Sequence, residues 1–218
     1  MLRWAILQDK KPIAIRMPSN GVNHAEGDVD TEYGYEPKYK VTHKGTEVAV
    51  IAAGSFYQKG ENVVRLLAKK GIDATLINPT YLNAVDTATL NALEADHRLV
   101  VTLEDGCKDG GFGERIAAFF GTSDMKVLVG GIKKDLYDRF DHQQLLSDNR
   151  LLDDQIAEDI LNPSEFHLSL NLIALCYSYV SHIVGYTAYT DMAALHDADC
   201  GTHPGCQTLL DLFVCPVS

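Results

Sequence analysis

Apolar and polar positions between residues 46 and 130 alternate in blocks that predict strands and helices in turn. Four runs are predicted to be strands: TEVAVIAAG, IDATLINP, RLVVTLEDG and MKVLVGG; the first has the continuous apolar character of a strand buried on both faces. Between them lie three stretches with helical spacing: GENVVRLLAKKG, DTATLNALEADH and GGFGERIAAFFG. Repeats of this kind predict a three-layer α/β fold with a mostly parallel, doubly wound sheet.

The ends of these helices are marked by ordinary signals. The first helix carries an apolar cluster, Val63, Val64, Leu66 and Leu67, and stops at Gly71. The second opens on Asp86, a candidate N-cap, and is predicted to end on His97, where hydrogen bonding to free carbonyls is the expected role. Two more helices are predicted, KDLYDRFDHQQLL and LLDDQIAEDIL, the latter with Leu152, Ile156 and Ile160 on one side.

The first eighteen residues do not belong to this sheet pattern. LRWAILQD is predicted to be helical without a cap, and PIAIRMP follows as a short strand. A polar linker then leads to the strand KYKVTHKG. We therefore expect residues 1–18 to close a preceding domain, 19–45 to hold the linker and first strand, 46–162 to form the α/β domain, and 163–218 to be a separate tail.

Charge and cysteine content exclude some functions. The net charge is −11 with no basic stripe, which argues against nucleic-acid and anionic-membrane partners. MLRWAILQDKK lacks the layout of a signal peptide, so we expect a cytoplasmic protein. Five cysteines form an odd set without disulfide-scaffold spacing, which is typical of reduced thiols.

The tail differs in composition from the rest of the chain, since none of the 19 Lys and Arg residues lies beyond residue 162. Residues 166–190 are uncharged and long enough to span a membrane, but Asn171, His182 and the lack of flanking basic residues argue against a transmembrane helix. HDADCGTHPGC offers a zinc alternative, but its spacing matches no familiar closed site, so no metal is predicted. The four residues of that alternative are His196, Cys200, His203 and Cys206.

EDGCKDGGFGE follows a strand and opens a helix, where α/β sheets gather ligands. Glu104 and the glycines Gly110, Gly111 and Gly113 could form a ligand or interface loop, and the alternative for the glycines is a tight turn for helix–sheet packing. Glu104 and Asp105 could be an acid–base pair or lie in a solvated turn. Cys107 lies beside Lys108, but no catalytic base is near it in sequence.

Several stretches together resemble the C-terminal end of the 1-deoxy-D-xylulose-5-phosphate synthases, thiamine-diphosphate enzymes of the transketolase superfamily. They are PIAIRMP, VDTEYGYEPKYKVTHKG, EVAVIAAGSF, GIDATLINPTYLNAVD and DHRLVVTLEDGCKDGGFGERIAAFFG. The resemblance covers residues 1 to about 161. It implies that residues 1–18 end the pyrimidine-binding domain and that the following domain is of the transketolase C-terminal type; the tail would be a non-family extension, for instance from a disrupted reading frame.

The resemblance also implies a role for Arg16, which stands where the family binds the phosphate of glyceraldehyde 3-phosphate. A guanidinium forks two N–H donors onto a phosphate. The family continues with an aromatic residue and Pro-Arg-Gly, whereas here Met17-Pro18-Ser19-Asn20 follow, so a second cation is missing.

Thiamine diphosphate and Mg²⁺ serve the full-length family through a Gly-Asp-Gly segment. This sequence has no such segment, so we expect this chain to bind no cofactor and to be a C-terminal fragment that is inactive alone. Expected partners are a second copy or the missing upstream domains. The alternatives are a stand-alone dimerisation or regulatory module, and a split subunit that completes an enzyme in trans.

Overall fold

The computed structural model describes residues 1–17 and 30–162. Contacts divide the chain into a unit of residues 1–162 and a unit of residues 163–218. The predictions for the tail, including the zinc alternative and the apolar stretch 166–190, lie outside the described residues. The account below therefore concerns the first unit alone.

A five-stranded sheet forms the centre of this unit, with strands in the order β1-β3-β2-β4-β5. Pairings between β2, β3, β4 and β5 are all parallel, and β1 pairs antiparallel with β3, so the predicted mostly parallel sheet is confirmed. The strand bounds are β1 Lys40–His43, β2 Glu47–Ala52, β3 Thr75–Asn78, β4 His97–Cys107 and β5 Lys126–Ile132.

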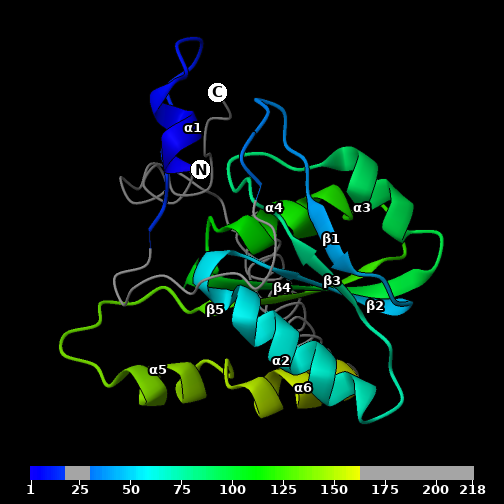
Figure 1. Ribbon diagram of the computed structural model, residues 1–218. Helices are drawn as coiled ribbons and strands as arrows, with labels where there is room; N and C mark the ends of the chain where they lie inside the picture. The colour runs from blue at the N-terminus through cyan, green and yellow to red at the C-terminus, as the bar shows by residue number, and fades with distance from the viewer. Residues whose placement is uncertain (18–29, 163–218) are drawn as a thin grey trace, which may run out of the picture. The chain divides into compact units, whose positions relative to one another are not determined.

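Helices cover both faces of the sheet, which makes the three predicted layers (Figure 1). On one face lie α2 (Tyr57–Ala68), α5 (His142–Asp148) and α6 (Asp153–Leu161). On the other lie α3 (Thr87–Leu93) and α4 (Phe112–Phe119). A short 3₁₀ turn, η1 (Gly54–Phe56), joins β2 to α2.

Each face of the sheet has its own hydrophobic core, because alternate residues of β2 and β4 point to opposite sides. Val50 and Val101 join Val63, Leu67 and Ile156 in the first core. Residues from the other side of the same strands, with those of α3 and α4, form the second core: Ala49, Ile51, Val100, Leu90, Ile116 and Phe120.

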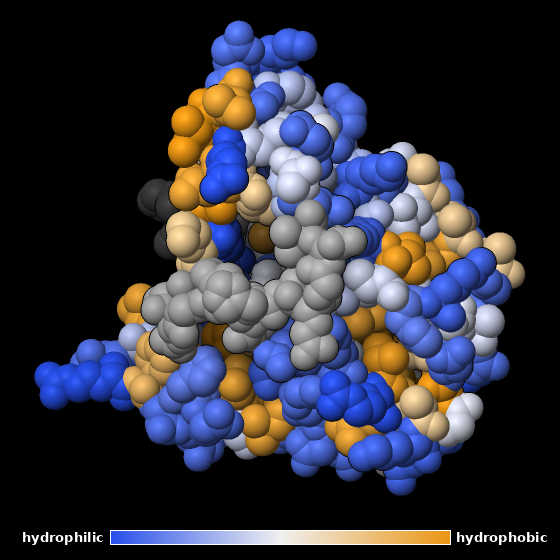
Figure 2. Space-filling view, in the orientation of Figure 1, coloured by the Kyte–Doolittle hydropathy of each residue, from blue (hydrophilic) through white to orange (hydrophobic). Residues whose placement is uncertain are grey.

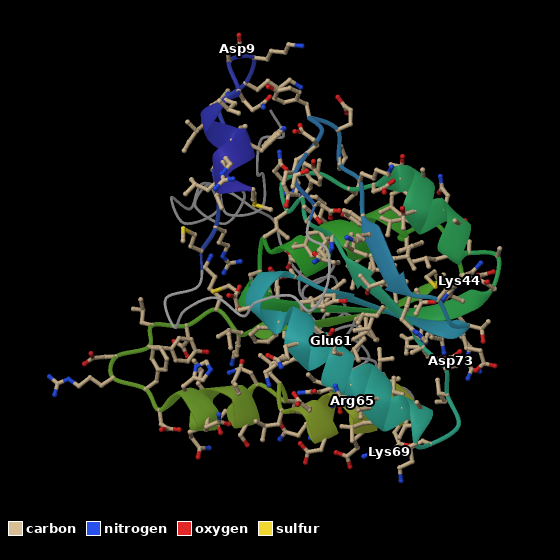
Figure 3. The ribbon with its side chains drawn as sticks, in the orientation of Figure 1. Asp9, Lys44, Glu61, Arg65, Lys69 and Asp73 are labelled. Atoms are coloured by element: carbon tan, nitrogen blue, oxygen red, sulfur yellow. The ribbon has the colours of Figure 1, made fainter. Side chains whose placement is uncertain are left out.

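The helix α2 separates an apolar side from a charged one, as its predicted pattern requires. Val63 and Leu67 have no exposed surface. Glu61, Arg65 and Lys69 follow one another along the outward side of the helix and its C-terminal end (Figure 3). The prediction for α6 is also confirmed, since Ile156 and Ile160 are buried in the core shared with α2.

The N-terminal segment differs from the prediction in its second half. A short helix, α1 (Leu2–Ile6), forms without a side-chain cap, as expected. The strand predicted for PIAIRMP is wrong, because residues 12–17 have no strand assignment. A strand needs a neighbour to complete its ladder, and Pro12 has no N–H to donate to one.

His97 begins a strand rather than ending a helix, so that predicted boundary is wrong. The helix α3 ends at Leu93, and His97 pairs with Glu47 at the start of β4. The imidazole Nδ1 still lies 3.2 Å from the carbonyl oxygen of Leu93, and Nε2 lies 2.8 Å from the hydroxyl of Thr75. His97 therefore contacts a carbonyl at the end of α3 from a different element, but that oxygen also accepts a hydrogen bond from the N–H of Asp96, and Nδ1 lies closer, at 2.6 Å, to Oδ1 of Asp96.

The helix predicted over KDLYDRFDHQQLL is also shorter than expected, since α5 covers only its second half. The side chain of Asp141 accepts a hydrogen bond from the N–H of Gln144 and starts the helix there. Before it, Leu136 and Phe140 are exposed, so no buried face supports an earlier start.

Asp86 is the N-cap of α3, as the sequence predicted. Its carboxylate accepts hydrogen bonds from the N–H and hydroxyl of Thr89 and from the N–H of Tyr39. Burial alone would raise the pKa of the Asp86 carboxyl, but the hydrogen bonds from Thr89 and Tyr39 outweigh it and hold the pKa below its usual value. Asp86 thus connects the start of α3 to Tyr39, the residue directly before β1.

We expect this cap to make stability depend on pH on the acid side. Because the folded-state pKa is lowered, the stabilising contribution is present above the unfolded pKa of about 4 and is lost as the pH falls through the folded value. Asp86→Asn should cost about 1 kcal/mol at pH 7, and much less at pH 2.5. Urea unfolding at both pH values checks this; an equal cost at both would contradict a stabilising charge.

Candidate functional site

The chain reverses its direction of travel across the sheet between β2 and β4. From β2 the chain crosses to β3 on one side, and from β3 it returns past β2 to β4 on the other. Parallel α/β sheets bind ligands outside the carboxyl ends of the strands at such a switch point. Here Gly54 and Ser55 follow β2, and Glu104 to Gly106 are among the last residues of β4. The candidate site is therefore at this edge.

The alternation of side chains along β4 separates the two acidic residues of this edge. The pairing of β4 with β5 shifts register between Leu103 and Cys107. Glu104 still lies on the side of β4 on which Val100 and Thr102 face the second core and α4. Glu104 is only 4% exposed, whereas the Asp105 side chain is 30% exposed. The solvated-turn alternative therefore does not describe Glu104, and the two carboxylates have different surroundings.

Glu104 closes the N-terminus of α4 from within the domain. Its Oε2 accepts a hydrogen bond from the N–H of Phe112 at 3.1 Å, and its Oε1 accepts one from the N–H of Gly113 at 2.9 Å. The first N–H groups of a helix lack partners inside the helix and favour negative charge. A carboxylate of the protein thus occupies the position in which this loop would otherwise hold an anion.

The glycines of the loop make room for this carboxylate. A Cβ on Gly111 would lie 2.5 Å from Oε1 of Glu104 and would also contact the carbonyl oxygen of Cys107. A Cβ on Gly113 would lie 2.5 Å from both Thr102 Oγ1 and Val129 Cγ1. Gly110 has a φ of 73°, a left-handed conformation that favours glycine in a tight turn. A Cβ at this position would meet no neighbouring atom within 4 Å. These are the contacts expected of the packing alternative for GGFGE.

Asp105 faces the other way and joins two distant parts of the chain. Its Oδ1 lies 2.5 Å from Nη2 of Arg16, and its Oδ2 accepts a hydrogen bond of 2.7 Å from the hydroxyl of Ser55. Arg16 therefore lies at the switch point, although the segment that carries it makes no strand. The Arg16 side chain is 54% exposed, so much of the guanidinium faces solvent.

Aromatic contacts hold the rest of the N-terminal segment. The Trp4 ring lies 5.6 Å from the Tyr33 ring and 6.0 Å from the Tyr35 ring, measured between centroids. The hydroxyl of Tyr35 donates a 2.6 Å hydrogen bond to Gln8. Apolar residues gather on the exposed side of α1 (Figure 2), where Leu2 and Ile6 are exposed.

Lys108 and Cys107 lie beside this edge. Burial lowers the pKa of the Lys108 ammonium, while Asp159 and Asp109 oppose that shift. Cys107 is exposed and not in a disulfide. Among the described residues no group of three or more His, Cys, Asp or Glu side chains could hold a metal ion. Within residues 1–17 and 30–162, no helix is long and apolar enough to cross a bilayer.

Sequence reasoning missed two features of the edge. Ser55 was not singled out, although a hydroxyl directly after a buried strand beside a switch point is a usable signal. The role of Glu104 as an internal cap was missed because it lies eight residues before Phe112, its first donor. A capping acid is ordinarily sought within the first turn of its own helix.

Comparison with known proteins places the described domain in a family. The model of the transketolase C-terminal domain matches residues 37–146. The 1-deoxy-D-xylulose-5-phosphate synthase of Crocosphaera subtropica is 29% identical over 164 residues, which are 66% of this chain and 26% of that protein. The enzyme of the same name from Rippkaea orientalis is 34% identical over 159 residues, 69% of this chain and 24% of that protein. The chain thus spans about a quarter of the length of these relatives.

A solved structure shares the fold. It is a split-gene transketolase in an inactive β4 tetramer, with a TM-score of 0.57 and 22% identity over 65% of this chain and 46% of that one. The resemblance to the 1-deoxy-D-xylulose-5-phosphate synthases that the sequence motifs indicated is confirmed by the curated relatives. The chain belongs to the transketolase C-terminal domain family.

Proposed function

We propose that this chain acts as the C-terminal part of a 1-deoxy-D-xylulose-5-phosphate synthase, an enzyme that condenses pyruvate with glyceraldehyde 3-phosphate and feeds isoprenoid precursors. The curated relatives support the reaction class. The observation that carries the proposal is the location of Arg16 at the switch-point edge, held by Asp105 of the C-terminal domain. We also propose that the protein works in the cytoplasm.

In this proposal Arg16 binds the phosphate of glyceraldehyde 3-phosphate. Its side chain is 54% exposed and paired at one terminal nitrogen, and a guanidinium offers five N–H donors in a fixed fork. Phosphate oxygens accept such donors in pairs. Met17 follows where the family has an aromatic residue, so we infer that other cations come from outside this segment.

Residues 1–18 would then be the end of the pyrimidine-binding domain, with 46–162 as the C-terminal domain and 163–218 as an extension. The exposed apolar residues of α1 support this division, since Leu2 and Ile6 lack a core of their own.

The full-length family uses thiamine diphosphate, which supplies the carbanion chemistry when bound. The loop before α4 does not fit its diphosphate, because the N–H groups of Phe112 and Gly113 already donate to Glu104. A second anion there would meet the buried Glu104 carboxylate. We infer that thiamine diphosphate and Mg²⁺ are held by the other domains of the enzyme.

Assays with pyruvate, glyceraldehyde 3-phosphate, thiamine diphosphate and Mg²⁺ test this proposal. We expect no turnover by the chain alone. Turnover by the chain alone would overturn the proposal. The second candidate, a split subunit, predicts turnover when a separate cofactor-binding chain is added. A dimerisation or regulatory module predicts self-association or modulation of another enzyme without turnover in either case.

Arg16→Ala should weaken the binding of inorganic phosphate by the full chain about fivefold, because one charge-assisted contact is lost at a partly exposed site. NMR titration with phosphate measures the affinity. Arg3→Ala is the matched control, since it removes an exposed arginine from the same N-terminal segment. Equal affinities for the two variants would contradict the phosphate role of Arg16.

A further inference from the structure

The contact between Arg16 and Asp105 is part of a chain of three side chains. The hydroxyl of Ser55 donates to Oδ2 of Asp105, and Oδ1 of the same carboxylate pairs with Nη2 of Arg16. Each residue comes from a different part of the sequence: the N-terminal segment, the turn η1 after β2, and the bulge of β4. Both carboxylate oxygens of Asp105 thus have a fixed partner.

The backbone around Asp105 is shaped for this contact. Gly54 has a φ of 56°, which lets the chain turn sharply after β2 and bring Ser55 over the end of β4. A Cβ on Gly106 would lie 3.9 Å from both terminal nitrogens of Arg16 and 3.3 Å from Oε2 of Glu104. A larger side chain at position 106 would therefore project into the space between the guanidinium and the buried carboxylate.

We propose that Asp105, oriented by Ser55, is a positioning residue that fixes the guanidinium of Arg16 at the carboxyl edge of the sheet. The proposal rests on the phosphate role proposed for Arg16 and adds a contribution from the C-terminal domain to the acceptor site. Arg16 follows a segment without strand pairing, so its backbone alone does not define where the guanidinium lies. The carboxylate of Asp105, at the end of β4, holds the guanidinium in place through their ion pair.

Phosphate affinity alone cannot report this role, because Asp105 has two opposed effects. Its negative charge repels a phosphate near Arg16, while its ion pair orders the guanidinium that binds the phosphate. Removing the charge of Asp105 therefore strengthens the attraction between phosphate and Arg16, and at the same time it frees the Arg16 side chain to move. A direct measure of how often the Arg16 side chain leaves Asp105 is needed.

Trypsin gives that measure, because cleavage after Arg16 requires its side chain to enter the protease pocket. We expect Asp105→Asn to raise the initial rate of cleavage at Arg16–Met17 about threefold in the full chain, the size typical of a partly exposed ion pair. Mass spectrometry also measures the rate of cleavage at Arg139–Phe140 in the same molecule. The ratio of the two rates is reported, because a general loss of stability would raise both rates and leave their ratio unchanged. Ser55→Ala should give a smaller increase, and Asp105→Glu should restore protection.

Asp124→Asn is the charge-matched control, since Asp124 is exposed in the turn before β5. The same cleavage ratio for Asp105→Asn, Asp124→Asn and the unmodified chain would overturn the positioning role. If the ratio rises for Asp105→Asn but Arg16→Ala leaves phosphate binding unchanged, the contact stands and the phosphate role fails. If Arg16→Ala weakens phosphate binding while the ratio is unchanged, the phosphate role stands and positioning by Asp105 fails.

Discussion

Glu104→Ala is expected to lower the free energy of unfolding of the full chain by about 3 kcal/mol. The buried carboxylate accepts the N–H groups of Phe112 and Gly113, and its removal leaves both donors at the start of α4 without an acceptor. Hydrogen bonds to charged groups are worth about 1.5–3 kcal/mol each, and such losses are not fully additive. Urea unfolding followed by circular dichroism measures the change.

Two further variants separate the cap from a general effect of charge. Glu104→Gln keeps the shape but turns one acceptor into a donor, so we expect about half of the loss. Glu114→Ala removes an exposed carboxylate that accepts the N–H of Gly110 near the same helix end, and it should cost about 1 kcal/mol or less. If Glu104→Ala and Glu114→Ala were equally destabilising, Glu104 would not be an internal cap.

Much of the fold could be predicted because each core element has a strong local pattern. From Val48 to Ala52 the strand β2 is apolar and buried, and the predicted helix over residues 60–71 overlaps α2 through its buried Val63 and Leu67. Predictions failed where the outcome depends on a partner outside the local pattern. The strand expected near Arg16 has no neighbouring strand, and Leu136 and Phe140 have no core to support a longer α5.

The candidate site was predicted only in part, because its contacts join segments that lie far apart in the sequence. Glu104 and Asp105 were singled out as neighbours that could act together. Alternation along β4 instead places Glu104 against the helix α4, whereas Asp105 contacts Ser55 and Arg16. Contacts between residues 50 or more positions apart, such as Ser55 with Asp105, require the strand order, which single-sequence patterns do not define.

The second large effect is expected for Gly113→Ala, which should destabilise the chain by about 2 kcal/mol. In an ordinary helix interior this change would stabilise by about 1 kcal/mol, because alanine has the higher helix propensity. Here the new Cβ would lie 2.5 Å from Thr102 Oγ1 and Val129 Cγ1, so α4 must move away from β4 and β5. That movement would also stretch the hydrogen bond from Gly113 to Glu104.

A double-mutant cycle with Thr102→Ala identifies the contact. Thr102 is fully buried, and within residues 1–17 and 30–162 its Oγ1 has no hydrogen-bond partner, so removing the hydroxyl breaks no hydrogen bond there. Thr102→Ala should therefore recover part of the loss caused by Gly113→Ala, about 1 kcal/mol, because the new methyl group gains space. Urea unfolding of the two single variants and the double variant gives the coupling energy. A stabilising effect of Gly113→Ala, or additive losses in the double variant, would mean that α4 does not pack on Thr102 in the way that positions Glu104.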